Sequence, residues 1–219
     1  MNQPEVVSRA AWIAARKALL LEEKQMTRAR DALNAERRRL PMVQIEKSYE
    51  FEGAGGKVDL GRLFEGRRQL IVYHMMWVEC PGCSLVVDNM GHLSHLHARD
   101  TTLVVVSRAT WPELNAFRQR MAWTVPFFSS SGSDFNHDFH VTLDDREDAE
   151  SEASGVSVFL RDGNSIFHTY STYDRGTDLL NGTLNYLDLT PLGRQEDWEE
   201  PAGRANSSAS GWWCLHDEY

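Results

Sequence analysis

The stretch Cys80-Pro81-Gly82-Cys83 lies between an apolar run and a helical pattern, and this arrangement constrains the fold more than any other feature. Residues 69–77 are apolar and rich in β-branched and aromatic side chains, so they predict one buried strand. Residues 84–90 predict the first turns of a helix. Two cysteines at such a turn are typical of a reactive dithiol, because the positive end of a helix stabilises a thiolate. Redox chemistry and binding of a soft metal ion are both open at this point.

The composition limits the classes of protein to consider. Hydrophobic residues make up 42% and charged residues 25% of the 219 positions, as in a globular protein with one ordinary domain and appendages. The net charge of −9 argues against non-specific nucleic-acid binding. No stretch approaches the roughly 20 apolar residues of a membrane helix, and a signal-peptide pattern is missing. With three cysteines, we expect a reducing, cytoplasmic location, where a Cys-x-x-Cys pair is catalytic or binds metal.

The N-terminal residues predict one long helix, because no Gly or Pro occurs between Glu5 and Leu40, and Pro41 then ends it. The segment is net basic, whereas the rest of the chain is acidic. We therefore expect this arm to dock on an acidic body, either within the chain or across a homodimer. The second seam of a coiled coil is poor, but one apolar ridge recurs every seven residues, at Trp12, Leu19, Met26, Leu33 and Leu40.

The rest of the chain alternates predicted strands with predicted helices. A polar region at 129–154 contains an acidic run and is expected to form loops, and the polar residues 195–210 are expected to be mobile. The aromatic residues 212–219 are expected to dock. The predicted elements are strands at 43–51, 70–77, 101–107 and 125–128, a strand hairpin at 156–173, and helices at 84–98, 111–121 and 176–187.

This order, strand, dithiol, helix, strand, helix, then a hairpin and a helix, is that of a thioredoxin-type α/β fold. We predict a three-layer sandwich with a mixed central sheet, plus a long N-terminal helix and a C-terminal tail. The crossovers make the first strands parallel, and the hairpin adds antiparallel strands. The expected divisions are a helical arm at 1–42, the thioredoxin-like domain at 43–192 and the tail at 193–219.

Several motifs resemble a known family over the whole chain. The chain is similar to the bacterial thioredoxin-like proteins grouped as domain of unknown function 899, which are distant relatives of the AhpC/TSA peroxiredoxins. The resemblance implies a thioredoxin fold and says little about the reaction. The segments that carry it are residues 70–73, 80–84, 97–103, 129–139, 158–173, 186–191 and 216–219.

Two departures from better-known thioredoxin-fold proteins concern the dithiol. A thioredoxin has a cis-proline before its terminal hairpin, whereas Ser154, Gly155 and Val156 stand here. The Thr-x-x-Cys pattern of a peroxiredoxin is absent too, since Trp77-Val78-Glu79 precedes Cys80. General disulfide reduction and efficient peroxide reduction are therefore both less well supported than the fold.

The leading functional prediction is a thioredoxin- or peroxiredoxin-like thiol–disulfide oxidoreductase. Cys80 would attack and Cys83 would resolve an internal disulfide. A reductant, either thioredoxin or a low-molecular-weight thiol, would then regenerate the dithiol, and a small molecule would be the other partner. His74, Glu79 and His168 are the candidates for proton transfer or substrate contact.

Two other functions compete with this prediction. Cys80 and Cys83 could bind copper or zinc together with His74, His137 or His140, for metal delivery or metal-assisted oxidation. The third reading is a non-catalytic interaction module that keeps the fold. Cys214 is expected to be a free or packed thiol.

Overall fold

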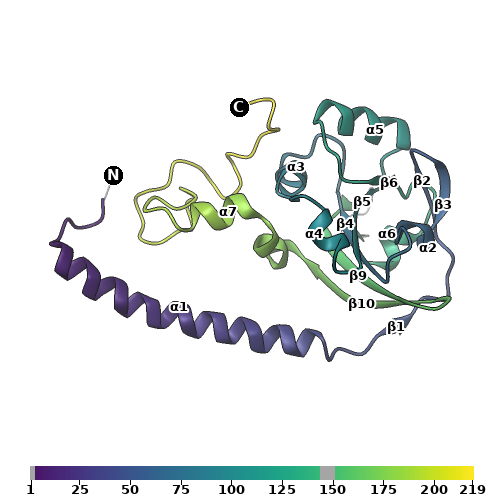
Figure 1. The fold of residues 1–219 in the computed structure, drawn as a ribbon. Coiled ribbons are helices and arrows are strands. Elements are labelled where there is room, and N and C mark those ends of the chain that lie inside the picture. The colour runs from purple at the N-terminus through teal and green to yellow at the C-terminus, as the bar shows by residue number, and fades with distance from the viewer. Residues whose placement is uncertain (1–2, 144–150) are drawn as a thin grey trace. The chain divides into compact units, whose positions relative to one another are not determined.

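A computed structural model describes residues 3–143 and 151–219 of the protein (Figure 1). The predicted acidic run at 144–150 lies outside the described residues. The chain separates into two compact units, one ending at Pro41 and the other starting at Met42. The second unit includes the C-terminal residues as well as the α/β domain.

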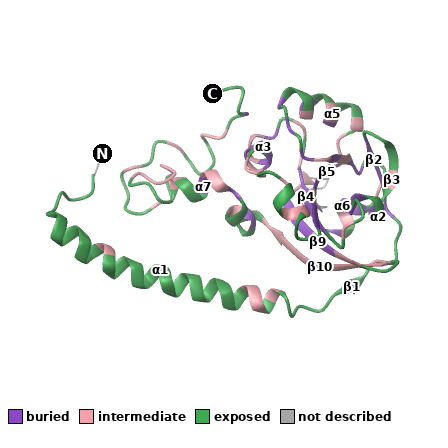
Figure 2. Cartoon of the chain, viewed as in Figure 1, coloured by how far each residue is buried: buried purple, intermediate pink, exposed green. Residues whose placement is uncertain are grey.

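The first unit is built on one helix, α1 (Arg9–Arg37), which confirms the predicted long helix. Its N-terminus is capped by Ser8, whose hydroxyl accepts the N–H of Ala11 at 3.2 Å. No residue of α1 is buried, and Figure 2 shows the helix mostly green, for exposed, with a few intermediate positions in pink. No helix among the described residues is long and apolar enough to cross a membrane.

The second unit contains an eight-stranded mixed sheet, with strand order β1-β10-β9-β4-β5-β6-β2-β3. The crossovers make β4, β5 and β6 parallel, while the β9–β10 hairpin is antiparallel, as the sequence predicted. The strands are β1 (Val43–Gln44), β2 (Glu50–Gly53), β3 (Gly56–Asp59), β4 (Gln69–His74), β5 (Thr101–Ser107), β6 (Phe127–Ser129), β9 (Gly155–Asp162) and β10 (Ser165–Tyr173). A separate two-stranded sheet pairs β7 (Thr142–Leu143) with β8 (Ser151–Glu152).

Helices cover both faces of the large sheet and give the three layers. We call the core on one face the dithiol cluster, because it contains Cys80 and Cys83 together with residues of α3 (Pro81–Asp88) and α5 (Trp111–Arg120). The core on the other face, the opposite cluster, contains residues of α2 (Leu60–Leu63) and α6 (Phe135–Asp138). Alternation along β4 decides which side chain joins which cluster, with Tyr73 in the dithiol cluster and Val72 in the opposite one.

Two predicted elements are divided in the structure. The strand expected at 43–51 is wrong as one element, because β1 pairs with β10 at one edge of the sheet and β2 pairs with β6 near the other edge. The helix expected up to residue 98 breaks after α3, where the side chain of Asn89 bonds the carbonyl of Leu85 at 2.7 Å. A short helix, α4 (Ser94–His97), follows.

The hairpin and the final helix also differ in detail from the prediction. A bulge between His168 and Tyr170 shifts the register of β10, so these two side chains do not share a face as alternation predicted. The final helix is a 3₁₀ helix, η1 (Asp174–Leu180), followed by α7 (Gly182–Leu187), which Asn181 caps.

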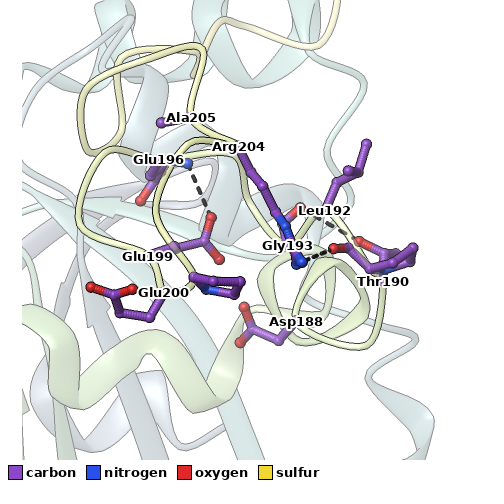
Figure 3. Close-up of a pocket in the computed structure, with 11 residues that line it drawn as sticks. Asp188, Thr190, Leu192, Gly193, Glu196, Glu199, Glu200, Arg204 and Ala205 are labelled. Carbon is purple, nitrogen blue, oxygen red and sulfur yellow. Dashed lines mark hydrogen bonds between the residues drawn. The ribbon is translucent and has the colours of Figure 1, made fainter. Parts of the chain in front are cut away.

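The polar C-terminal segment is organised around one buried carboxylate, that of Glu196, rather than being a featureless tail. Glu196 is 4% exposed and accepts hydrogen bonds from the indole N–H groups of Trp198 (2.6 Å) and Trp212 (2.8 Å). The backbone N–H of Glu196 donates to the carboxylate of Glu199 at 3.0 Å, a bond drawn as a dashed line in Figure 3. Both residues line a cavity of about 160 Å³ to which Asp188 and Glu200 also contribute. The composition of this segment predicted polarity correctly but not these contacts.

Candidate functional site

The two cysteines lie where β4 turns into α3, as the sequence predicted. Cys80 is the N-cap of α3, with an extended backbone, and Pro81 occupies the first turn, where its missing N–H costs no helical hydrogen bond. The Cys80 sulfur accepts the backbone N–H of Cys83 at 3.3 Å. The thiol of Cys80 therefore replaces the oxygen that usually caps a helix, and a charged sulfur would be stabilised there.

The second sulfur lies deeper and is held from the strand side. Cys83 is fully buried, and its sulfur accepts the backbone N–H of Met76 at 3.4 Å. The Cys83 sulfur and the N–H groups of Cys83 and Gly82 lower the pKa of Cys80. The Cys80 sulfur and burial raise the pKa of Cys83 well above its ordinary value. The first thiol to ionise is therefore Cys80, and neither cysteine is in a disulfide.

Tyr73 on β4 is a site residue that the sequence analysis missed. Its side chain belongs to the dithiol cluster, and its buried hydroxyl interacts with the Cys83 sulfur and has no other hydrogen-bond partner among the described residues. Burial, and then the charge that Cys83 would carry as a thiolate, raise the pKa of Tyr73 well above its ordinary value. The hydroxyl therefore stays protonated and can donate a hydrogen bond. Strand alternation would have identified Tyr73 if the orientation of one neighbour had been known.

Glu79 lies directly before the dithiol in a conformation that is rare for a residue with a side chain, with φ of 66°. Its carboxylate is paired with Arg120 Nη1 at 3.0 Å. The same guanidinium binds Asp217 at 2.8 Å and Glu218 at 3.1 Å. Arg120 thus ties the entrance of the dithiol loop to the C-terminus, and Glu79 has a charged partner instead of acting alone as a proton acceptor.

The last nine residues, 211–219, cross the dithiol, and we call this segment the strap. Leu215 is 2% exposed and belongs to the dithiol cluster, which confirms the predicted docking of the aromatic end. A Cβ atom on Gly82 would lie 2.9 Å from the ring of Trp213, so the indole packs directly on the turn between the cysteines. His216 bonds Asp88 at 2.8 Å at the far end of α3. Cys80, which shares the dithiol cluster with Leu215, is only 2% exposed.

A cavity of about 240 Å³ lies beside the dithiol. Its walls near the cysteines are Tyr73, Met76 and Gly82, and Trp213 also lines it. Ser154, at the position where the sequence comparison noted the missing proline, lies on the same cavity. The remaining lining residues are Val86, Asp174, Arg175, Thr177, Asp178, Asn181 and Leu184.

The predicted proton-transfer residue His74 does not face the dithiol. It is the last residue of β4, and its ring lies 5.6 Å from that of Phe135 in the opposite cluster. Its Nε2 lies 2.9 Å from the Ser157 hydroxyl, and burial lowers its pKa to about 3. His74 is therefore neutral and structural in this arrangement.

His168 is also on the side of the opposite cluster, with its ring 5.2 Å from Phe139. Its Nε2 lies 2.8 Å from the Ser171 hydroxyl, which in turn lies 2.9 Å from that of Ser157. A chain of hydrogen bonds thus joins His168 to His74 across three strands. Burial lowers the pKa of His168. The structure separates both histidines from Cys80 and Cys83.

The predicted metal ligands are not brought together. The described residues include no group of three or more His, Cys, Asp or Glu side chains that could hold a metal ion. Within that part of the chain, Cys80 and Cys83 are not gathered with His74, His137 or His140. The physical reason is the sheet, because His74 and α6, which carries His137 and precedes His140, pack with the opposite cluster.

Comparison with known proteins assigns the chain to a family. A family model described as "Bacterial protein of unknown function (DUF899)" matches residues 1–219. The chain belongs to this family. A search of curated proteins found no match.

Solved structures that resemble the chain are peroxiredoxins. A cysteine-to-serine mutant of peroxiredoxin 6 from Arenicola marina has 10% sequence identity and a TM-score of 0.51, over 68% of this chain and 74% of that chain. Peroxidoxin BcpB from Mycobacterium tuberculosis has 15% identity and a TM-score of 0.49, over 68% and 96%. PrxQ from Xylella fastidiosa, also a mutant, has 14% identity and a TM-score of 0.48, over 63% and 88%. The likeness to peroxiredoxin 6 establishes the thioredoxin-like α/β fold that the sequence predicted.

Proposed function

We propose that the protein is a thiol–disulfide oxidoreductase in which Cys80 is the nucleophile and Cys83 the resolving thiol. The observation that carries this proposal is the unequal environment of the two sulfurs. Cys80 caps α3 and receives backbone N–H groups, which lower its pKa, whereas burial and the neighbouring sulfur raise the pKa of Cys83. In a pair of this kind one sulfur ionises more readily and can attack, while the other stays protonated until the resolving step.

The chemistry uses the two electrons of the dithiol. The Cys80 thiolate attacks one sulfur of a disulfide R–S–S–R, forms a mixed disulfide and expels RS⁻, which takes up a proton. Cys83 then loses its proton and attacks the Cys80 sulfur, which closes the internal disulfide and expels the second thiolate. The substrate disulfide is reduced to two thiols, and an external thiol reductant restores the dithiol.

Tyr73 suits a role in the second step. Its protonated hydroxyl lies in the dithiol cluster without another partner, so it can donate a hydrogen bond to the Cys83 sulfur as that thiol ionises. In this proposal Tyr73 is a positioning residue for the resolving thiol. His74 and His168 have no part, because they pack with the opposite cluster.

The test is a thiol count on the Cys214→Ser variant, which leaves only the two thiols in question. Mild oxidation should remove both titratable thiols, and dithiothreitol should restore them. Iodoacetamide should modify Cys80 with a midpoint pH below the ordinary thiol pKa of about 8.5. Replacement of Cys83 by Ser should trap a mixed disulfide with a small disulfide, and replacement of Cys80 by Ser should abolish it.

The burial of both sulfurs favours one competing function, the non-catalytic interaction module. After mild oxidation, the protein is unfolded and its thiols are counted. If both cysteines are still free thiols, the pair is inert, and the non-catalytic interaction module is the better description. The same preparation, analysed for copper and zinc by mass spectrometry, tests the metal alternative, for which the described residues offer no three-ligand group.

A further inference from the structure

The strap and the cavity together restrict what can reach the dithiol. The cavity includes Gly82, the residue between the cysteines whose N–H is bonded to the Cys80 sulfur, but neither Cys80 nor Cys83 is part of its lining. Trp213 is the lining residue that also packs on Gly82. The cavity therefore ends at the turn between the cysteines, and the indole of Trp213 stands at that end.

The size of the cavity separates small partners from large ones. Its volume of about 240 Å³ lies below the roughly 300–1,000 Å³ of ordinary ligand sites. Because a water molecule takes up about 30 Å³ of liquid, the cavity has room for a ligand on the order of ten non-hydrogen atoms. A protein disulfide carries main chain on both sides of each sulfur and cannot enter while the strap is in place.

Residues on both sides of Trp213 attach the strap by burial, an ion pair and a hydrogen bond, whereas the indole of Trp213 makes no such polar contact within the described residues. Leu215 is buried, and Arg120 holds Asp217 at 2.8 Å. Before it, Trp212 donates its indole N–H to Glu196 at 2.8 Å. The indole N–H of Trp213, by contrast, has no hydrogen-bond partner in the part of the chain that the structure describes. The ring of Trp213 is therefore held by its contacts with Gly82 and Trp212 rather than by a hydrogen bond of its indole.

We propose that the strap selects the reaction partners of the dithiol by size, with Trp213 as the specificity-determining residue. Disulfides and thiols of low molecular weight reach Cys80 through the cavity when the Trp213 ring moves. Protein disulfides and protein reductants are excluded, because their approach requires the whole strap to leave. This inference rests on the proposed function and names its partner class. The electrons follow the exchange steps given above, from the Cys80–Cys83 dithiol to the small disulfide.

The experiment compares two substrates on the reduced protein. Bis(2-hydroxyethyl) disulfide is the small substrate, and insulin is the protein disulfide. The wild-type protein should oxidise with the small disulfide at least about tenfold faster than with insulin. Trp213→Ala should raise the rate with the small disulfide by about threefold or more, because no ring then has to move, and should change the rate with insulin by less than about twofold, because Leu215 and Arg120 keep the rest of the strap docked. Trp12→Ala, at an exposed position on α1, is the matched control and should leave both rates unchanged.

Arg120→Gln provides a second variant at an exposed position, in case Trp213→Ala does not fold. It removes the pairs with Asp217 and Glu218, as well as the pair with Glu79, so it loosens the strap and should raise the rate with insulin relative to the small disulfide. A wild-type protein that reacts as fast with insulin as with the small disulfide overturns the size selection and leaves the oxidoreductase intact. A protein that reacts with neither substrate, and whose thiols do not oxidise, overturns the proposed function itself.

Discussion

The two ends of the chain are both rich in apolar side chains, but only the C-terminal end buries one of them fully. No residue of the 29-residue helix α1 is buried, although its apolar ridge repeats every seven residues. The strap has no regular secondary structure, yet Leu215 is 2% exposed and Trp213 packs on Gly82. A regular pattern therefore determines a helix, whereas docking depends on what complementary groups lie opposite, here Arg120 and Asp88.

The largest expected effect contrasts one leucine from each end. Leu215→Ala should lower the free energy of unfolding by about 2–5 kcal/mol, because it removes buried methyl groups and leaves a cavity beside the dithiol. Leu33→Ala in α1, at 50% exposure, should change it by less than about 0.5 kcal/mol. Urea denaturation of both variants measures the difference. Equal effects would show that burial does not distinguish the two ends.

A second prediction concerns acid, and it locates the pH sensitivity in the sheet rather than at either end. Burial lowers the pKa of His74 to about 3, from an ordinary value near 6.5. Between these two pH values the imidazole is protonated in the unfolded chain but not in the folded protein. The free energy of unfolding should therefore fall by up to about 1.4 kcal/mol for each pH unit below 6.5.

His74→Phe removes this proton and should flatten the loss of stability between pH 6.5 and 4.5, relative to the wild-type protein. Its ring can pack against Phe135, while Ser157 keeps the bond to Ser171. His95→Phe, at an exposed position on α4, is the matched control and should keep the wild-type slope. Chemical denaturation across the pH range measures it, and an unchanged slope in His74→Phe would contradict the assignment.

The hydrogen bonds of Asp88 test how the far end of the strap is attached. Asp88 accepts the indole N–H of Trp123 at 2.6 Å and the imidazole of His216 at 2.8 Å. Asp88→Ala leaves the partly buried indole N–H unpaired, so we expect a loss of about 1–3 kcal/mol. His216→Ala keeps the Trp123 bond and should cost less. Thermal unfolding measures the loss of stability in each variant. A larger loss in His216→Ala than in Asp88→Ala would mean that the attachment of the strap depends on His216.

Substitutions in the apolar ridge of α1 should have the smallest effect on the free energy of unfolding of a single chain. Their effect should appear instead in the association of two chains. A long helix with an exposed apolar ridge gains most of its stability from packing, so we propose that the ridge pairs two copies of the chain. Leu19→Glu should convert the dimer to a monomer in sedimentation experiments, and Lys17→Glu, beside it, should not. A wild-type protein that is monomeric at all concentrations would contradict this proposal.

The predictions from sequence succeeded where the signal is local. The run of residues 69–77 and the Cys-x-x-Cys turn predicted β4 and the start of α3, and the apolar strand at 101–107 was confirmed as β5 (Thr101–Ser107). Periodicity predicted α1 and α5 in the same way. These features depend on neighbours within a few residues, which is why one sequence is enough to find them.

The site was predicted only in part, because the face on which a strand residue lies depends on its partners. The sequence pointed to His74, whereas alternation along β4 places Tyr73 in the dithiol cluster and His74 in the opposite one. The bulge in β10 likewise changed the face of His168 relative to Tyr170. A shift of one residue reverses every side chain of a strand, and nothing local in the sequence fixes that register.

The sequence alone was sufficient for the family resemblance, the order of the elements and the position of the two cysteines at the N-terminus of a helix. Long-range packing determined that the strap covers these cysteines, that Tyr73 faces them and that the histidines do not. The bonds that place the strap join residues far apart in the chain, such as Arg120 with Asp217 and Asp88 with His216. No periodicity or propensity encodes such pairs, because they form only when the sheet has brought their elements together.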